Sequence, residues 1–160
     1  NHSNPLLVDE GFTLKQMEKL SNDYIVGLVD GEGSFTVYVR DPDSLKKVKR
    51  RVKVEPRFYL KLIEKDKKIL YDLKEFFGCG NVYFQRDIRP NHQNCYRYEV
   101  CNRQELIDVI IPFFKKNQLR LVSKKKDFVI FCDLMKRIDK KEHLSDAGLR
   151  KIYQLKQTMH

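Results

Sequence analysis

A chain of 160 residues is long enough to bury one hydrophobic core but short for two independent domains. Lys and Arg total 32 against 22 Asp and Glu, and the resulting formal charge of +10 favours a polyanionic partner, nucleic acid first. The 41% hydrophobic content excludes a disordered basic tail, and no apolar run approaches the ~20 residues of a membrane span, so we expect an intracellular protein without a membrane partner.

The N-terminal part of the chain leads into one strongly apolar helix. Residues 1–20 are expected to form an N-terminal extension, and residues 21–160 a single domain. Ser21, with Asn22, can cap a helix over residues 23–31, because a side-chain oxygen can accept a hydrogen bond from a free amide of the first turn, and Gly31 and Gly33 are expected to end it. Apolar side chains nearly surround this helix and predict burial on most sides: Tyr24, Ile25, Val26, Leu28 and Val29.

A hairpin is predicted next. Apolar and polar residues alternate over residues 34–40 and 54–63, which is typical of two half-buried strands. Asp41, Pro42 and Asp43 turn the chain between them. The connection also holds a basic run that we expect to meet phosphates rather than bases: Lys46, Lys47, Lys49, Arg50, Arg51 and Lys53.

A second hairpin follows a helix over residues 66–77, which Gly78 is expected to end. Its strands are predicted over residues 81–87 and 95–101. Five of their apolar residues should face inward: Val82, Phe84, Tyr96, Tyr98 and Val100. Three further helices are expected, over residues 104–114, from a cap at Ser123 to residue 138, and over residues 145–157.

Strands grouped in pairs, rather than alternating one by one with helices, predict an α+β fold of order αββαββα. We expect an antiparallel four-stranded sheet with helices on one face and the other face open. The open face should carry hydrogen-bonding and cationic side chains suited to binding a ligand: Ser34, Thr36, Tyr38, Arg40, Arg57, Tyr59, Lys61, Tyr83, Gln85, Arg97 and Glu99.

Cysteine and histidine spacing argues against several classes of site. The four cysteines, at positions 79, 95, 101 and 132, form no C-x-x-C pair, which disfavours a zinc or redox motif. The four histidines, at positions 2, 92, 143 and 160, are isolated, which disfavours an HNH-type nuclease. No small-molecule substrate is expected.

The segment over residues 25–33 resembles the nine-residue signature of the LAGLIDADG homing endonuclease family. It departs from that pattern by Val26 in place of a small residue and by Glu32 in place of the commoner aspartate, which keeps a carboxylate. Similarity continues through Ser34 and Phe35, the Gly78-containing turn, Pro112 and residues 124–128. The resemblance implies a saddle-shaped sheet that reads the DNA major groove.

A homodimer is expected from the helix that carries this signature. Gly27 has no Cβ, so a second copy of the helix can approach closely and cover its apolar surface. The chain has one such motif, whereas a monomeric family member needs two. The expected interface consists of Tyr24, Gly27, Leu28 and Gly31, and two-fold symmetry implies a long pseudo-palindromic target in double-stranded DNA.

The resemblance also implies a metal centre. Glu32, with the carbonyl of Gly31, would bind Mg²⁺ or Mn²⁺ beside the scissile phosphate, whereas Asp30 is expected to cap or hydrogen-bond across the helix pair. Further catalytic candidates, by their place in the sequence, are Glu64, Lys68 or its neighbour Lys67, Lys124 and Lys125. Among the open-face residues, the expected base contacts are Arg40, Arg57, Lys61, Gln85 and Arg97.

The sequence thus predicts a site-specific, metal-dependent DNA endonuclease of the intron-homing type, placed in the cytoplasm or nucleoid of a prokaryote or inside an organelle. An RNA-splicing maturase and a non-cleaving DNA-binding regulator of the same fold are the alternatives, and Glu32 argues against lost chemistry. A basic structural protein that binds nucleic acid by charge alone would show no sequence preference and a dominant salt effect.

Overall fold

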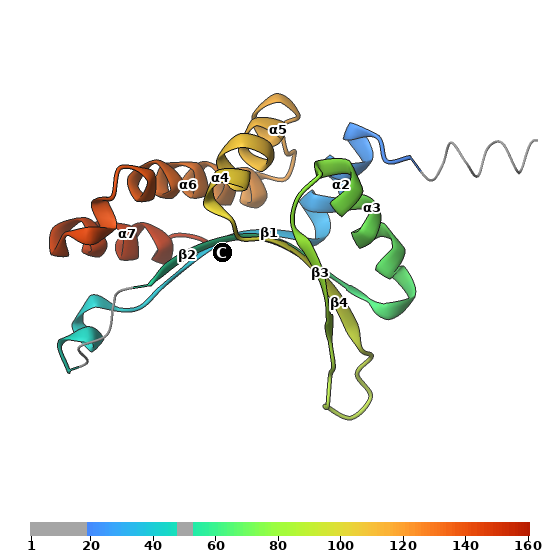
Figure 1. The fold of residues 1–160 in the computed structure, drawn as a ribbon, viewed down its shortest axis with the longest axis horizontal. Helices are drawn as coiled ribbons and strands as arrows, with labels where there is room; N and C mark the ends of the chain where they lie inside the picture. The colour runs from blue at the N-terminus through green and yellow to red at the C-terminus, as the bar shows by residue number, and fades with distance from the viewer. Residues whose placement is uncertain (1–18, 48–52) are drawn as a thin grey trace, which may run out of the picture.

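The computed structural model describes residues 19–47 and 53–160 (Figure 1). Most of the expected N-terminal extension, residues 1–18, and the basic residues Lys49, Arg50 and Arg51 lie outside this part of the chain. The helices are α2 (Asn22–Glu32), α3 (Lys67–Phe77), α4 (Arg103–Glu105), α5 (Ile111–Lys116), α6 (Val122–Asp139) and α7 (Asp146–Gln157). The strands are β1 (Gly33–Val39), β2 (Val54–Ile63), β3 (Asn81–Gln85) and β4 (Cys95–Val100).

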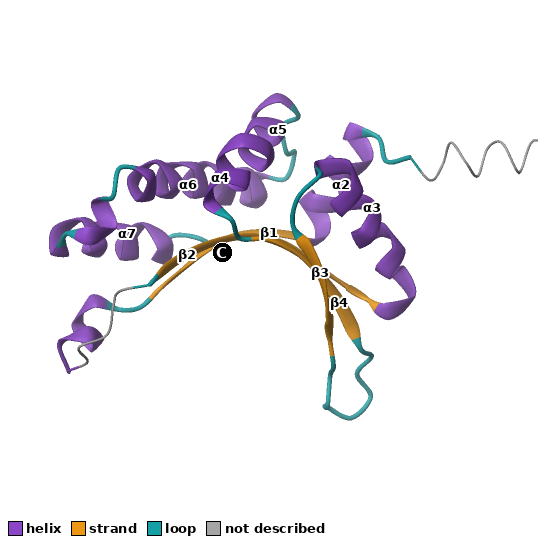
Figure 2. Ribbon diagram, viewed as in Figure 1, coloured by secondary structure: helices purple, strands orange, loops and turns teal. Residues whose placement is uncertain are grey.

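One antiparallel sheet of four strands, in the order β1-β2-β4-β3, organises the molecule. Each predicted hairpin forms, and the two hairpins join through β2 and β4, where Leu60 pairs with Tyr98. The helices cover one face of an arched sheet and leave the concave face open (Figures 1 and 2). The predicted α+β architecture with a saddle-shaped sheet is therefore confirmed.

Aromatic packing fixes the helices on the sheet. Phe35 of β1 has ring centroids at 5.1 to 5.5 Å from Phe58 of β2, Phe114 of α5, and Phe128 and Phe131 of α6. Rings at these separations contribute edge-to-face and offset contacts in addition to the free energy of burying their area. The start of α6 is held over the first strand as a result.

Local chemistry explains where most elements begin and end. The Ser21 hydroxyl accepts a hydrogen bond from the Tyr24 amide at 3.1 Å and starts α2 as predicted. Gly78 ends α3 with φ +68°, a left-handed conformation in which glycine carries no Cβ penalty. Ser145 likewise caps α7 by accepting from the Gly148 amide at 3.0 Å.

The helix predicted over residues 104–114 is interrupted. α4 passes into a π-helical turn, Leu106–Ile110, before α5 begins. Pro112 supplies a physical reason, because it has no N–H for the residue 108 carbonyl and its ring would clash with that carbonyl in a regular helix. A wider turn relieves the clash.

Two sequence-based predictions were wrong. Ser123 does not cap the following helix: α6 begins at Val122, its N-cap position is Leu121, and no side chain of the cap residue bonds the first turn. Phe84 does not face the core, since 52% of it is exposed on β3, an edge strand, where its ring contacts Tyr96 at 5.3 Å. Strand alternation gives the side of the sheet, but it does not show whether a helix covers that side.

Candidate functional site

One face of α2 is uncovered. Tyr24 is 48% exposed, Gly27 and Gly31 are exposed, and Leu28 is half-buried. A Cβ placed on either glycine would meet no atom within 4 Å. Positions three and four residues apart share a helix face, so these four residues form one continuous surface, named here the α2 face. The four residues predicted as a dimer interface are thus brought together.

The opposite side of α2 lies in the subunit's own core. Ile25 and Val29 are fully buried, and Val26, the departure from the family signature, is 6% exposed. The prediction that this helix is buried on most sides, with a second copy covering what one chain leaves exposed, stays a prediction. Val26 lies away from the α2 face, so its bulk does not obstruct a partner there.

Glu32, the last residue of α2, has an exposed side chain, and no hydrogen bond or ion pair joins it to the described residues. Gly31 precedes it in the last helical turn, whose carbonyls lack intrahelical donors. Carboxylate and carbonyl oxygens are the donors that hard divalent cations prefer. Among residues 19–47 and 53–160, no three His, Cys, Asp or Glu side chains cluster closely enough to hold a metal ion.

Lys124 lies beside this end of α2. Its ammonium group donates to the carbonyl of Gly33, the residue after Glu32. Asp30, which is 9% exposed, accepts hydrogen bonds from the backbone amides of Arg120 and Leu121 just before α6. Asp30 therefore acts within the subunit as a backbone acceptor, and together with Lys124 it fixes the start of α6 against the carboxylate-bearing end of α2.

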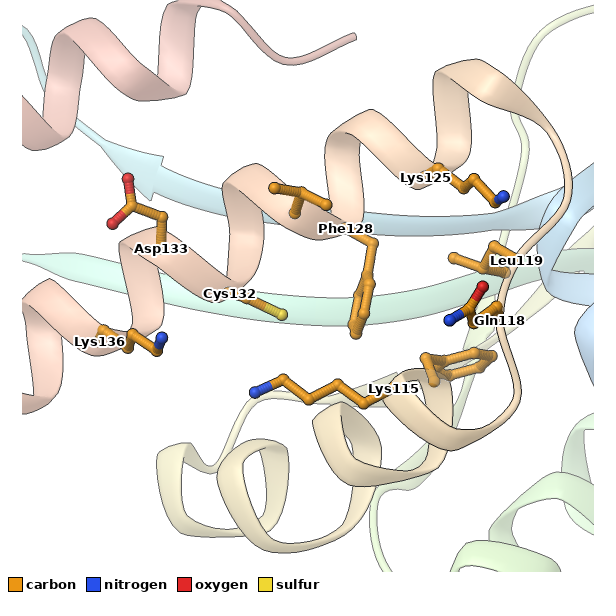
Figure 3. A pocket seen from close by; sticks show the side chains of 10 residues that line it. Lys115, Gln118, Leu119, Lys125, Phe128, Cys132, Asp133 and Lys136 are labelled. Carbon is orange, nitrogen blue, oxygen red and sulfur yellow. The ribbon is translucent and has the colours of Figure 1, made fainter.

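The other catalytic candidates lie in different surroundings. Lys125 lines a cavity between α5 and α6 (Figure 3). Lys68 pairs with Asp72 at 3.1 Å, one turn along α3. Glu64 follows β2 in an exposed turn, where its backbone amide donates to the carbonyl of Asn94. Among the lysine candidates, Lys124 has the contact that places it next to Glu32.

The register of the sheet places the predicted binding residues on the concave face. Ser34 pairs with Tyr59, Lys61 with Arg97, and Tyr83 with the same Arg97. The remaining strand members follow by alternation, and Arg40 lies just after β1, within 3.4 Å of the Tyr38 hydroxyl. Sequence reasoning missed two residues on this face, Glu55 opposite Tyr38 and Asn81 opposite Glu99, although the same alternation marks both.

An arginine network occupies the middle of the concave face. Glu99, with 13% of its side chain exposed, lies 3.0 Å from Arg97 and 3.4 Å from Arg57. The Arg97 guanidinium also stacks 3.6 Å from the centre of the Tyr59 ring. Together with the Arg57–Glu55 ion pair at 3.0 Å, these contacts hold both arginines in place.

Unsatisfied polar atoms mark the same face. Within the described part of the chain, the buried atoms Arg57 Nε, Arg97 Nε and Gln85 Oε1 have no hydrogen-bond partner. Buried donors and acceptors are nearly always paired in folded proteins, so such atoms on a binding face indicate groups that a ligand completes. The face offers both donors and acceptors, in the combination that base edges present to a protein.

Residues 25–135 match the LAGLIDADG endonuclease family. The chain belongs to this family. It is 30% identical over 124 residues to the probable intron-encoded DNA endonuclease 1 of Mycosarcoma maydis, covering 78% of this chain and 40% of that protein. It is also 30% identical over 116 residues to the homing endonuclease I-ApeII of Aeropyrum pernix, covering 72% of this chain and 63% of that one. The chain therefore spans less than two thirds of these relatives.

Solved structures agree with the family assignment. The homing endonuclease I-TnaI superposes with a TM-score of 0.73 at 34% identity, covering 89% of both chains. The LAGLIDADG homing endonuclease I-SmaMI, bound to cleaved DNA, gives a TM-score of 0.74 at 31% identity over 89% of this chain and 44% of its own. The LAGLIDADG match runs from α2 into α6 and so includes Gly27, Leu28 and Gly31 of the α2 face, Glu32, all four strands and Lys124. In the described residues, no helix has the length and apolarity to cross a membrane.

Proposed function

We propose that this chain is a subunit of an intron-homing endonuclease that works as a homodimer. In this proposal it hydrolyses both strands of a long pseudo-palindromic double-stranded DNA target with Mg²⁺ or Mn²⁺. The observation that carries the proposal is the exposed Glu32 carboxylate, which has no partner among the described residues, at the end of the uncovered α2 face. Family membership and relatives named as endonucleases support the same conclusion.

The dimer follows from the α2 face. Gly27 and Gly31 leave open space along one side of α2, so two copies of the helix can pack with their backbones close together. A two-fold axis along this contact brings the two Glu32 carboxylates near each other, where like charges repel unless cations lie between them. Each subunit would supply some of the oxygen ligands of the cations, and the two subunits together would supply the full set.

Each residue at this end of α2 has a distinct proposed role. Glu32 and the carbonyl of Gly31 hold the divalent cation, which would lower the pKa of the attacking water and neutralise charge on the leaving oxygen. The Lys124 ammonium, now bonded to Gly33, can instead orient water or a phosphate oxygen when DNA is bound. Lys125, Lys68 and Glu64 remain predicted contributors from their place in the sequence.

The concave face would read the DNA. Its curvature and its basic side chains Arg40, Arg57, Lys61 and Arg97 suit a ribbon lying in the major groove (Figure 1). Arg can bond guanine and Gln can bond adenine through two hydrogen bonds each, which makes Gln85 and the arginines the residues that set sequence preference. Two copies related by the dimer axis would read two half-sites.

The decisive variant is Glu32→Gln, which removes one charge per subunit and keeps the side-chain shape. Sites cleaved by the wild type are first selected from a randomised duplex library in Mg²⁺. The variant should then retain its sedimentation behaviour and its affinity for a selected site, and lose cutting. The exposed Glu75→Gln on α3 serves as a matched control and should cut normally. Cutting by Glu32→Gln at the wild-type rate would exclude the assigned site, and splicing of intron RNA without duplex cutting would identify a maturase instead.

A further inference from the structure

A cavity of about 520 Å³ lies between α5 and α6, on the helical side of the sheet (Figures 2 and 3). This volume falls within the range of 300 to 1,000 Å³ in which proteins enclose small molecules. The proposed DNA-reading face is on the opposite side of the sheet, so the cavity, apart from Lys125 at one end of its wall, is separate from the proposed endonuclease site.

The cavity has a mostly apolar wall. The side chains of Leu119 and Phe128 form its floor, and Val129, with 66% of its surface exposed, stands at its rim. The wall therefore suits the hydrocarbon or ring portion of a ligand.

Two lysines from different helices converge at one end of the cavity. Figure 3 shows Lys115 of α5 and Lys136 of α6 extending toward Cys132, with the Phe128 ring beside them. Burial raises the pKa of the Cys132 thiol, and the charges of Lys115 and Lys136 offset part of that rise. Lys125 adds a third cation at the opposite end.

These lysines have no anionic partner among residues 19–47 and 53–160. No ion pair joins Lys115, Lys125 or Lys136 to a carboxylate in that part of the chain. The one carboxylate in the cavity wall, Asp133, instead pairs with Arg137 at 3.3 Å. The cavity thus combines an apolar wall with uncompensated positive charge at its ends.

We propose that this cavity binds a small amphiphilic anion, with its apolar body against Phe128 and Val129 and its acidic group between Lys115 and Lys136. A small inorganic anion would leave the apolar wall exposed to water, and a neutral amphiphile would leave the ammonium groups without an anionic partner. The ligand class is therefore a carboxylate or sulfonate attached to a chain or a ring.

The probes are 1-anilinonaphthalene-8-sulfonate, followed by its fluorescence, and decanoate as a competitor, with the full chain folded as judged by circular dichroism. Decanoate should displace the dye at roughly tenfold lower concentration than the neutral decanol, because only the acid pairs with lysine. Inorganic phosphate at the same concentration should displace little. Equal competition by decanol, or displacement by phosphate as effective as by decanoate, would overturn the proposal.

Substitutions in the cavity wall test whether the dye binds there. Lys115→Ala combined with Lys136→Ala should weaken dye binding about tenfold, whereas the controls Lys116→Ala and Lys126→Ala, exposed lysines outside the cavity wall, should change it by less than about twofold. Val129→Glu tests the site without touching the core and should also weaken binding, because it places a carboxylate at the rim. Equal effects of cavity and control variants would show that the dye binds elsewhere.

Discussion

The Asp30 carboxylate accepts hydrogen bonds through both of its oxygens from the backbone amide of Arg120, at 3.1 and 3.0 Å, across 90 residues of sequence. The Leu121 amide also donates to it at 3.2 Å. Since α6 has no side-chain cap of its own, this contact fixes where α6 starts and hence where Lys124 lies relative to Glu32. A residue inside the family signature thus positions the site from within the subunit.

Asp30→Asn should lower the free energy of unfolding by about 1.5 to 3 kcal/mol, the usual contribution of hydrogen bonds to a charged group. The amide keeps one acceptor but turns an N–H toward the Arg120 and Leu121 donors. Urea unfolding monitored by circular dichroism measures the change. Asp139→Asn, an exposed carboxylate at the end of α6, is the matched control and should change stability by less than about 0.5 kcal/mol. Equal effects of the two variants would show that the Asp30 contact does not hold α6.

Gly27→Leu should separate dimerisation from folding. The open space at Gly27 accepts the new side chain within one subunit, and replacing a helical glycine favours the helix by about 0.5 to 1 kcal/mol. The same side chain would block a second α2 from approaching. Analytical ultracentrifugation should therefore give a folded species of half the wild-type mass. Ala147→Leu, which adds an equal side chain to an exposed position of α7, should leave the wild-type mass unchanged. A Gly27→Leu protein that keeps that mass would place the interface elsewhere.

Features of this site that depend on residues close together in the sequence could be predicted, whereas features that depend on contacts between distant residues could not. The ends of β2 were predicted at the residues observed, because strand alternation and turn residues are local signals. Glu32 was found through a contiguous signature. The start of α6 was misplaced because Asp30, remote in sequence, holds the segment before it. Lys124 and Lys125 could not be told apart in a run of three lysines, since only packing decides which one faces β1.

The cavity between α5 and α6 had no sequence signal at all. Its wall comes from two helices whose residues are individually ordinary, and the π-helical turn before α5 changes the direction of Lys115 relative to a regular helix. Packing between elements, rather than any motif, places those lysines together.

Arg97→Ala should lower DNA affinity by about 1 to 3 kcal/mol at one base position in each half-site, as expected when a direct contact to a base is lost. Binding measured against a panel of singly substituted targets locates that position, and Arg57→Ala is expected to affect a different one. A uniform loss on every target would instead indicate phosphate contacts. Lys151→Ala on α7, an exposed lysine of the helical side, should leave the panel unchanged.

Glu99→Gln is the complementary change on the same face. Glu99 lies 3.0 Å from Arg97 and 3.4 Å from Arg57, and Arg57 also pairs with Glu55 at 3.0 Å, so removing the charge of Glu99 frees Arg97 for phosphate and leaves Arg57 with one carboxylate partner in place of two. Binding to unrelated DNA should then strengthen, and the logarithm of the binding constant should fall more steeply with the logarithm of salt concentration. An unchanged salt slope would show that the two arginines do not meet the phosphate backbone.

His143 should make stability depend on pH. It is 8% exposed between α6 and α7, and within the described residues its Nδ1 has no partner. Burial and the charge of Arg103 lower the pKa of its imidazole below the unfolded value of 6.5. As the pH falls, His143 of the unfolded chain therefore takes up a proton at a higher pH than His143 of the folded chain does. The contribution of neutral His143 is complete above pH 6.5 and falls as pH drops below it, with a slope of at most about 1.4 kcal/mol per pH unit.

Urea unfolding at pH 7.5, 6.5 and 5.5 measures this loss, and His143→Gln separates it from the titration of carboxylates. The difference in unfolding free energy between wild type and His143→Gln should shrink as pH falls from 6.5 to 5.5, because glutamine does not titrate. If the difference in unfolding free energy between wild type and His143→Gln stays constant over this pH range, the folded protein must accommodate a charged imidazolium. The Nδ1 of His143, which has no partner in the described residues, and the nearby charge of Arg103 argue against that outcome.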